Sequence, residues 1–258
     1  MPGPLVDGSM SDGPATTFRE VVIIGGGCYG TFYAGQLTRA MARGRLVAQR
    51  ITLVDRDPAC QATRDGPVRP PFSLEVMDWG DYLDRLLASA PPAPGEPDDA
   101  IVPSPLMPHL MAEWLVRSVA AAYPTRSVRL APVAAPVGTP YDVPAPDGNR
   151  YVSFADWICP THCIEPSTCP VTQGPRTWEM ADALIDYVRR ENRAAPMDGP
   201  ALFTTRHRAF GVGMFDAAEA RSARRLLDQA VSERGMARLL VGTISACHGA
   251  TSVVEVSG

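Results

Sequence analysis

The sequence contains no lysine: all 24 of its basic residues are arginine. This absence excludes Schiff-base and pyridoxal phosphate chemistry, which need a lysine amine. It also excludes a Walker phosphate-binding loop, which depends on a lysine. The Tyr-x-x-x-Lys pair of short-chain dehydrogenases is impossible for the same reason. Whole classes of enzyme are thereby removed from consideration.

The chain also lacks a strong positive charge and any long apolar run. Its formal net charge is −4 and its pI is about 5.6, so no basic field attracts a phosphate backbone. No stretch approaches the roughly 18–20 consecutive apolar residues of a transmembrane helix. Residues 1–20 lack the basic start and apolar middle of a signal peptide. We expect a cytoplasmic protein that neither binds nucleic acid nor inserts into a membrane.

Apolar runs alternate with amphipathic stretches through the first half of the chain. Residues 21–24 and 51–54 are rich in β-branched side chains, as in parallel strands that are covered on both faces. Between them, the spacing of apolar residues from 29 to 43 suits a helix packed on a sheet. Further strands are predicted at 72–77 and 100–102, with helices at 80–88 and 108–122. Strands that alternate with helices specify a parallel sheet with right-handed connections.

A glycine-rich segment, Gly25-Gly-Gly-Cys-Tyr-Gly30, joins the first strand to this helix. In a G-x-G-x-x-G loop the first glycine permits a tight turn, the second lets the backbone approach a pyrophosphate, and the third allows close helix packing. Those roles fall on Gly25, Gly27 and Gly30. The amides and the dipole at the start of the helix then favour anionic phosphates.

Asp55 ends the second predicted strand, where a carboxylate can accept hydrogen bonds from the ribose hydroxyls of a dinucleotide. A carboxylate there would repel a 2′-phosphate, so NAD(H) or FAD is preferred to NADP(H). Asp55 follows Gly25 by more than the roughly 20 residues of the fingerprint. We attribute the extra length to residues 42–50, which extend the helix or the loop after it.

With this glycine loop and Asp55, residues 18–130 resemble the Rossmann-fold NAD(P)/FAD-binding superfamily. Residues 74–83 are similar to the third strand of TrkA-type nucleotide-binding domains, and this resemblance implies that Asp78 approaches the adenine. The same fold serves dehydrogenases, flavoproteins and ligand sensors, so the resemblance implies a bound nucleotide rather than a reaction. The expected cofactor-binding residues are Gly25, Gly27, Cys28, Tyr29, Gly30, Asp55 and Asp78.

The expected fold is an α/β protein with a Rossmann-like, doubly wound parallel sheet and a C-terminal α/β extension that carries a cysteine-rich metal loop. Gly, Pro, Ser and Asp are frequent in residues 1–17, which we interpret as a disordered lead-in. The Rossmann-type domain then spans residues 18–130, and the proline-rich residues 131–150 form a linker. Residues 151–258 form the cysteine-containing segment. Within it we predict helices at 177–192 and 216–234 and strands at 201–214, 239–244 and 251–256.

Three cysteines fall within eleven residues, in Cys159-Pro-Thr-His-Cys163-Ile-Glu-Pro-Ser-Thr-Cys169-Pro. Six cysteines in the whole chain are too few for a secreted disulfide scaffold, so we interpret this loop as a metal-ligand set in a reducing compartment. Thiolates select zinc or iron–sulfur clusters. The spacing differs from the paired Cys-x2-Cys of structural zinc sites, and the Cys-Pro steps are in the style of iron–sulfur loops. We therefore expect an iron–sulfur cluster, with zinc and metal-free thiols as alternatives.

The fourth ligand must come from elsewhere in the chain. Cys247 is the best candidate, because it lies between two apolar strands in a loop that can reach back across the sheet. His162 and His248, each near a cysteine, are the alternatives. Cys28 and Cys60 are interpreted as small buried side chains.

Together these motifs favour a redox protein that couples a bound dinucleotide, NAD(H) or FAD, to a cysteine-ligated iron–sulfur cluster. It would act as an electron-transfer or oxidoreductase subunit with a protein redox partner or within a larger complex. No acid, base or nucleophile can be assigned: Glu165 has no identifiable acid–base partner, and the Arg-His-Arg segment at 206–208 is interpreted as facing solvent. This absence favours the alternative of a non-catalytic, nucleotide-binding accessory or sensor subunit with a structural zinc site. A metal-free thiol enzyme that uses Cys163 or Cys169 is the third hypothesis.

Overall fold

The computed structural model describes residues 15–66, 71–155 and 163–258. Its helices are α1 (Cys28–Ala42), α2 (Gln61–Asp65), α3 (Trp79–Ala88), α4 (Leu110–Ala122), α5 (Met180–Glu191) and α6 (Ala217–Arg234). Its strands are β1 (Thr16–Ile24), β2 (Leu46–Asp55), β3 (Phe72–Val76), β4 (Ala100–Val102), β5 (Ser127–Ala131), β6 (Tyr141–Pro144), β7 (Arg150–Ser153), β8 (Gly199–Thr204), β9 (Arg206–Ala209), β10 (Val212–Asp216), β11 (Ala237–Ile244) and β12 (His248–Ser257). The expected α/β class is confirmed, with two mixed sheets that we name sheet 1 and sheet 2. None of the helices in the described ranges is long and apolar enough to cross a membrane.

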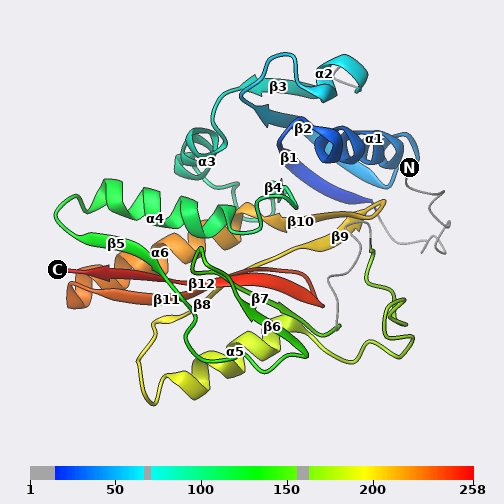
Figure 1. Cartoon of the computed structure of the whole chain (residues 1–258). Coiled ribbons are helices and arrows are strands. Elements are labelled where there is room, and N and C mark those ends of the chain that lie inside the picture. The colour runs from blue at the N-terminus through cyan, green and yellow to red at the C-terminus, as the bar shows by residue number, and fades with distance from the viewer. Residues whose placement is uncertain (1–14, 67–70, 156–162) are drawn as a thin grey trace.

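Sheet 1 has the strand order β3-β2-β1-β4-β10-β9 (Figure 1). The strands from the N-terminal part of the chain, β3, β2, β1 and β4, run parallel to one another. β10 pairs antiparallel with β4, and β9 pairs antiparallel with β10. Sheet 1 is therefore mixed rather than wholly parallel, because the C-terminal half of the chain supplies a hairpin to its edge.

Sheet 2 has the order β6-β7-β12-β11-β8, and β5 also pairs with β12. β8 and β11 run parallel, whereas the other pairs in this sheet are antiparallel. β6 lies within residues 131–150, the stretch interpreted as a linker, and it pairs with β7. β5, near the end of the expected N-terminal domain, pairs with β12 at the C-terminal end of the chain. Strands of the expected N-terminal domain and of the expected linker thus pair with strands of the C-terminal segment, and a C-terminal strand pairs into sheet 1.

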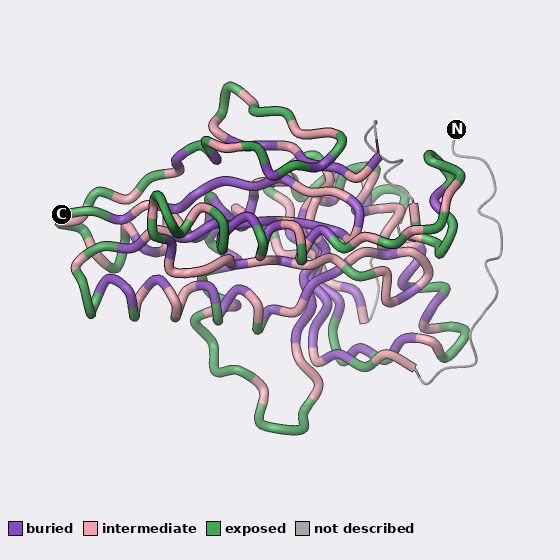
Figure 2. The backbone as a smooth tube through the Cα atoms, turned by 90° about the horizontal axis from the view of Figure 1, so that it is seen from below, coloured by how far each residue is buried: buried purple, intermediate pink, exposed green. Residues whose placement is uncertain are grey.

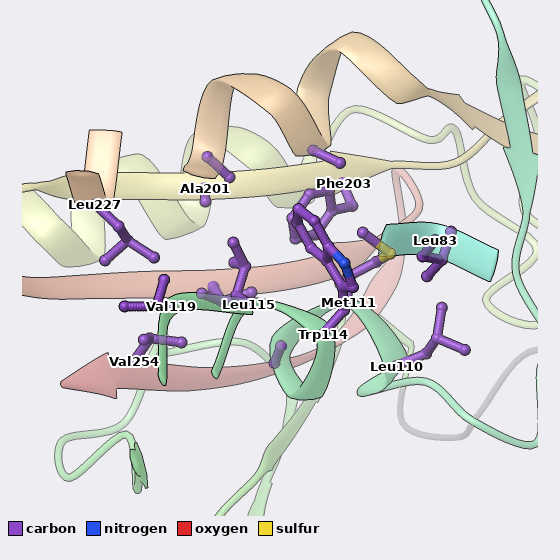
Figure 3. Close-up of a cluster of buried hydrophobic side chains, with 14 of the residues drawn as sticks. Leu83, Leu110, Met111, Trp114, Leu115, Val119, Ala201, Phe203, Leu227 and Val254 are labelled. Atoms are coloured by element: carbon purple, nitrogen blue, oxygen red, sulfur yellow. The ribbon is translucent and has the colours of Figure 1, made fainter. Parts of the chain in front are cut away.

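Helices α3, α4 and α6 lie between the two sheets and share one hydrophobic core with both. Leu115 of α4 and Leu227 of α6 belong to this core together with Phe203 of sheet 2 (Figure 3). Val22 of sheet 1 belongs to it as well. Separate clusters pack α1 on the outer face of sheet 1 and α5 on the outer face of sheet 2. Buried residues accordingly lie along the central strands, whereas residues in the peripheral loops are exposed (Figure 2).

Among the predicted boundaries that differ from the observed ones, two lie close to the candidate site residues. α1 ends at Ala42, Gly44 adopts a left-handed φ of 64°, and β2 already begins at Leu46. The extra length between Gly25 and Asp55 therefore lies in a ten-residue strand and not in a longer helix. The strand predicted at 201–214 is three strands, β8, β9 and β10, and a two-residue turn separates the last two.

Candidate functional site

The glycine loop follows β1 directly and leads into α1. Gly25 has a φ of 89°, in the left-handed region that favours glycine, and its N–H donates to the Val54 carbonyl at 2.9 Å. A Cβ on Gly30 would lie 1.9 Å from the Gly25 carbonyl oxygen, so only glycine lets α1 pack this closely on the loop. Both residues thus have the geometric roles that the sequence pattern predicts for them.

The start of α1 is open to a ligand. Gly27 precedes the helix and has no side chain to cap it, and both Gly27 and Cys28 are exposed. A Cβ on Gly27 would meet no described atom within 4 Å. The first amides of a helix have no partner within the helix and carry partial positive charge. The exposure of Cys28 corrects its interpretation as a buried side chain, whereas Cys60 is buried as expected.

Asp55 lies beside this loop at the end of β2. Its Oδ2 accepts a hydrogen bond from the Gly26 N–H at 2.6 Å, and its Oδ1 accepts one from the Asp57 N–H at 2.9 Å. Each carboxylate oxygen keeps a second lone pair, and the side chain is partly exposed. The Gly26 carbonyl in turn accepts from the Ala62 N–H of α2 at 2.8 Å. The carboxylate therefore orders the glycine loop and still has acceptor capacity for a hydroxyl donor.

Asp78 caps the start of α3 at the neighbouring edge of sheet 1. Its carboxylate accepts from the Gly80 N–H at 2.7 Å and from the Arg56 Nε at 2.9 Å. Burial opposes ionisation of Asp78, but the hydrogen bonds from Arg56 and Gly80 outweigh it and lower its pKa. Arg56 directly follows Asp55, so the two aspartates predicted to bind the nucleotide belong to one corner of the sheet.

The metal-ligand prediction concerns four cysteines, of which Cys163, Cys169 and Cys247 are described. Cys159 and the alternative ligand His162 lie outside the described residues. Each described sulfur accepts a hydrogen bond from nitrogen: Cys163 Sγ from the Glu165 N–H at 3.4 Å, Cys169 Sγ from the Thr172 N–H at 3.5 Å, and Cys247 Sγ from Trp178 Nε1 at 3.3 Å. Donors of this kind stabilise sulfur that carries negative charge.

The three thiols differ in their acidity. Burial raises the pKa of Cys163 and raises that of Cys247 to about 11. Hydrogen bonds from Thr172 lower the pKa of Cys169. A thiol of raised pKa is protonated at neutral pH and is a weak nucleophile. The arrangement therefore does not favour Cys163 as the nucleophile of a thiol enzyme.

Glu165 and His207, to which the sequence analysis assigned no role, lie beside these cysteines, and His207 is largely buried rather than facing solvent. Glu165 Oε1 accepts from the Cys247 N–H at 3.2 Å, and Glu165 Oε2 lies 3.9 Å from Nε2 of His207. His207 is on β9, and its Nδ1 lies 2.9 Å from the Gly211 carbonyl oxygen. Glu165 therefore links the cysteine loop to the β11–β12 turn and to the edge strand of sheet 1.

His248, the alternative ligand at the start of β12, lies in the same neighbourhood. Burial lowers its pKa, with an opposing influence from Glu165 and a reinforcing one from His207. Its Nδ1 lies 3.4 Å from Ser245 Oγ. Within residues 15–66, 71–155 and 163–258, no group of three or more histidine, cysteine, aspartate or glutamate side chains is arranged to hold a metal ion. The sulfur, nitrogen and oxygen donors are thus neighbours rather than a formed coordination sphere.

The glycine loop and the cysteine region lie at different strands of sheet 1. The loop follows β1, whereas His207 lies on β9, three positions further along the strand order. At the usual spacing of neighbouring strands this is about 14 Å measured across the sheet.

Two cavities are lined by none of the candidate ligand residues of either region. One of about 400 Å³ lies along α6 and β8 and includes Asp98 and Glu219. The other, of about 790 Å³, lies between α3 and sheet 1 and includes Arg50 and Tyr82.

The fold and these two regions define an α/β protein with a glycine loop in its N-terminal half and a cysteine- and histidine-containing region in its C-terminal half. The chain belongs to the AF_1314_C family, described as "Uncharacterized protein, C-terminal domain", whose family model matches residues 111–257. The matched residues include Cys159, Cys163, Cys169 and Cys247, and the glycine loop precedes them. No curated protein and no solved structure matches the chain.

Proposed function

We propose that this chain is a dinucleotide-binding redox protein whose glycine loop holds the pyrophosphate of NAD(H) or FAD. The observation that carries the proposal is the parallel order β3-β2-β1-β4, with the glycine loop at the end of β1. The strand order reverses between β1 and β4, and open α/β sheets bind their ligands at such a switch point. A Rossmann-type unit within sheet 1 is therefore the interpretation that fits this half of the chain best.

Different residues at the loop would contact different parts of the dinucleotide. The exposed amides of Gly27 and Cys28, at the start of α1, would hold the phosphates. Tyr29 follows in the first turn, and Asp55 would accept from the ribose hydroxyls through its free lone pairs. Asp78 would lie toward the adenine. The carboxylate of Asp55 favours a free 2′-hydroxyl over a 2′-phosphate, so NAD(H) and FAD are preferred to NADP(H).

The cysteines would provide the second redox element. Cys163, Cys169 and Cys247, together with Cys159, would hold an iron–sulfur cluster, which supplies one-electron transfer when bound. The N–H donors on the three described sulfurs support this role, because such donors stabilise thiolate ligands. The chain would then act as an oxidoreductase or electron-transfer subunit in the cytoplasm, with a protein redox partner.

A second candidate function is a non-catalytic nucleotide sensor or accessory subunit with a zinc site. The observation that favours it is the mixture of sulfur, imidazole and carboxylate donors around Glu165. Zinc accepts such mixed sets, whereas most clusters are held by thiolates alone. Nucleotide binding without turnover on electron donors would support this candidate over the first.

Equilibrium titration of the full chain with NADH, NADPH, FAD and ADP-ribose tests the nucleotide part. We expect binding of NADH or FAD, and Gly27→Ala should weaken it by about tenfold or more, because a methyl group would occupy the space above the loop. Gly35→Ala on the same helix is the matched control, since a Cβ there also meets no described atom within 4 Å. If no dinucleotide binds, or if both variants bind as the unmodified protein does, the proposal is wrong.

Iron and sulfide assays with absorption spectra of anaerobically purified protein test the metal part. Stoichiometric iron and sulfide would support the electron-transfer subunit. A colourless protein that contains zinc would instead support the sensor. Protein that holds neither metal would contradict both.

A further inference from the structure

The tautomer of His207 is fixed by its surroundings. Its Nδ1 lies 2.9 Å from the Gly211 carbonyl oxygen, which can only accept a hydrogen bond, so Nδ1 carries the proton. In the neutral ring the Nε2 lone pair is then free, and it lies 3.9 Å from Oε2 of Glu165. A histidine that donates through one nitrogen to a carbonyl and offers the other is the arrangement that orients metal-binding histidines.

The separation of Nε2 and Oε2 fits two ligands of one cation better than a direct bond. At 3.9 Å the two atoms are too far apart for a hydrogen bond. Two ligands of a tetrahedral zinc ion, at the usual zinc–nitrogen and zinc–oxygen distances, lie about 3.4 Å apart. The side chains of His207 and Glu165 are only 17% and 11% exposed. Buried carboxylates are usually paired with positive groups, and Arg176 also interacts electrostatically with Glu165.

Strained backbone holds both side chains in place. Glu165 has a φ of 54°, and Phe210, in the turn whose Gly211 carbonyl faces His207, has a φ of 47°. Residues other than glycine rarely adopt these values, and such strain persists where the surrounding structure enforces it, often at functional sites. Gly213 of β10 lies opposite His207 in the β9–β10 pair.

Two cysteines lie next to Glu165, the carboxylate that faces His207. The Glu165 N–H donates to Cys163 Sγ at 3.4 Å, and the Cys247 N–H donates to Glu165 Oε1 at 3.2 Å. The environment therefore offers imidazole, carboxylate and thiol groups from three separate segments of the chain. Zinc is the common divalent ion that accepts all three donor types.

We propose that His207 Nε2 is a ligand of a zinc ion bound at this position, with the Glu165 carboxylate as its neighbour and a thiolate of Cys163 or Cys247 completing the protein ligands. Among the described residues no three such groups surround one point, so zinc binding at this position requires one thiol side chain to rotate toward the ion. This inference rests on the metal part of the proposed function, in its zinc form, and is independent of nucleotide binding.

Zinc titration of the full chain, with a competing chelator dye, tests the inference. We expect one ion per chain, and His207→Gln should weaken binding by about 100-fold or more, because a ligand is lost. Glu165→Gln should weaken binding by about 10- to 100-fold. His109→Gln is the matched control, because His109 pairs with Glu113 at the start of α4 and should leave zinc affinity unchanged.

The outcomes separate this inference from the proposals it rests on. If the unmodified chain binds no zinc, the inference and the zinc form of the metal site fail together, while the dinucleotide titrations still report on the glycine loop. If zinc binds and His207→Gln binds it equally well, this inference fails and a zinc site with other ligands remains.

Nitrogen NMR of the unmodified protein gives an answer even if a variant does not fold. The chain has four histidines, which makes their ring signals assignable. Zinc should shift Nε2 of His207 while its Nδ1 keeps the proton. A shift confined to another histidine would overturn the proposal.

Discussion

At the scale of single residues, Glu20 on β1 illustrates how a buried carboxylate is held in this protein. Its side chain is almost fully buried, and its Oε1 accepts from Thr52 Oγ1 at 2.5 Å and from the Tyr82 hydroxyl at 2.7 Å. Arg50 donates to Oε2. Burial would raise the pKa of Glu20, but these hydrogen bonds together outweigh burial and lower it. The ionised carboxylate therefore stabilises the folded state.

Glu20→Gln should lower the free energy of unfolding by about 1–3 kcal/mol at neutral pH, because the charge-assisted hydrogen bonds are lost. The folded pKa of Glu20 lies below the unfolded value of about 4.3, so the ionised carboxylate stabilises the folded state fully above that pH. It is lost as the pH falls through the folded pKa. Urea denaturation at neutral pH and near pH 3.5 should show the gap between variant and unmodified protein closing on acidification.

Glu233→Gln provides the control for this comparison. Glu233 is on α6, and its side chain is 53% exposed. We expect its substitution to change stability by less than about 0.5 kcal/mol at either pH. If the effect of Glu20→Gln on stability grew on acidification, the pKa of Glu20 would not be lowered in the folded protein.

Residue roles set by local geometry could be predicted from the sequence, and those set by distant contacts could not. Gly25 and Gly30 have the predicted roles because a strand, a turn and a helix adjacent in sequence define them. Glu165 and His207 come from different segments, and only the folded chain brings them together. One local signal existed: Glu165 follows Cys163 by two residues, a distance at which its N–H reaches the sulfur.

At the scale of elements, α1 packs so closely against the glycine loop that a side chain at position 30 would clash with the loop backbone. Gly30→Ala would place a methyl group 1.9 Å from the Gly25 carbonyl oxygen, so α1 must move away from β1. We expect a loss of about 2–4 kcal/mol in the free energy of unfolding, measured by chemical denaturation.

Gly35→Ala separates this clash from the general effect of alanine in a helix. A Cβ on Gly35 meets no described atom within 4 Å. We expect it to stabilise the protein by about 0.5–1 kcal/mol, because alanine favours the helix more than glycine does. Equal effects of the two substitutions would show that α1 does not pack as described.

Strongly periodic elements were predicted well, and irregular ones were not. α6 stands within one residue of its expected position, because a long apolar pattern reports which face of a helix is buried. β1 ends where expected but begins at Thr16, before its apolar run. The turn between β9 and β10 was missed because Phe210 occupies a left-handed position that turn statistics assign to glycine or asparagine. β6 was missed because proline in a sequence argues against a strand, and it is tolerated here at a strand on the edge of sheet 2.

At the scale of the whole molecule, each half of the chain contributes strands or helices to the sheet or core of the other half. β9 and β10 complete sheet 1, β5 pairs into sheet 2, and α4 and α6 lie in the core between them. Beside this core, fully buried Asp99, the residue before β4, accepts two hydrogen bonds from Arg19. Its backbone carbonyl accepts a third from the first amide of α6. The core between the sheets draws residues from both halves of the chain, so neither half alone contains all of it.

Leu227→Ala tests this coupling, because Leu227 on α6 is fully buried in the shared core. We expect a loss of about 2–5 kcal/mol from the cavity that forms. Hydrogen exchange should show the same loss in amides of β2 and of β11, since both sheets unfold together. Leu106→Ala, at a residue that is 71% exposed, should change neither. A loss confined to β11 would mean that the sheets open independently.

The hairpin of β9 and β10 also sets the order in which the protein can be completed during synthesis. β4 leaves the ribosome more than a hundred residues before β10, which pairs with it. At usual translation rates of roughly 5–20 residues per second, that delay is on the order of 10 s. For this interval β4 exposes an unpaired edge, the feature that promotes association with other chains. The nascent N-terminal half thus carries this unpaired edge until β10 has left the ribosome and can pair with β4.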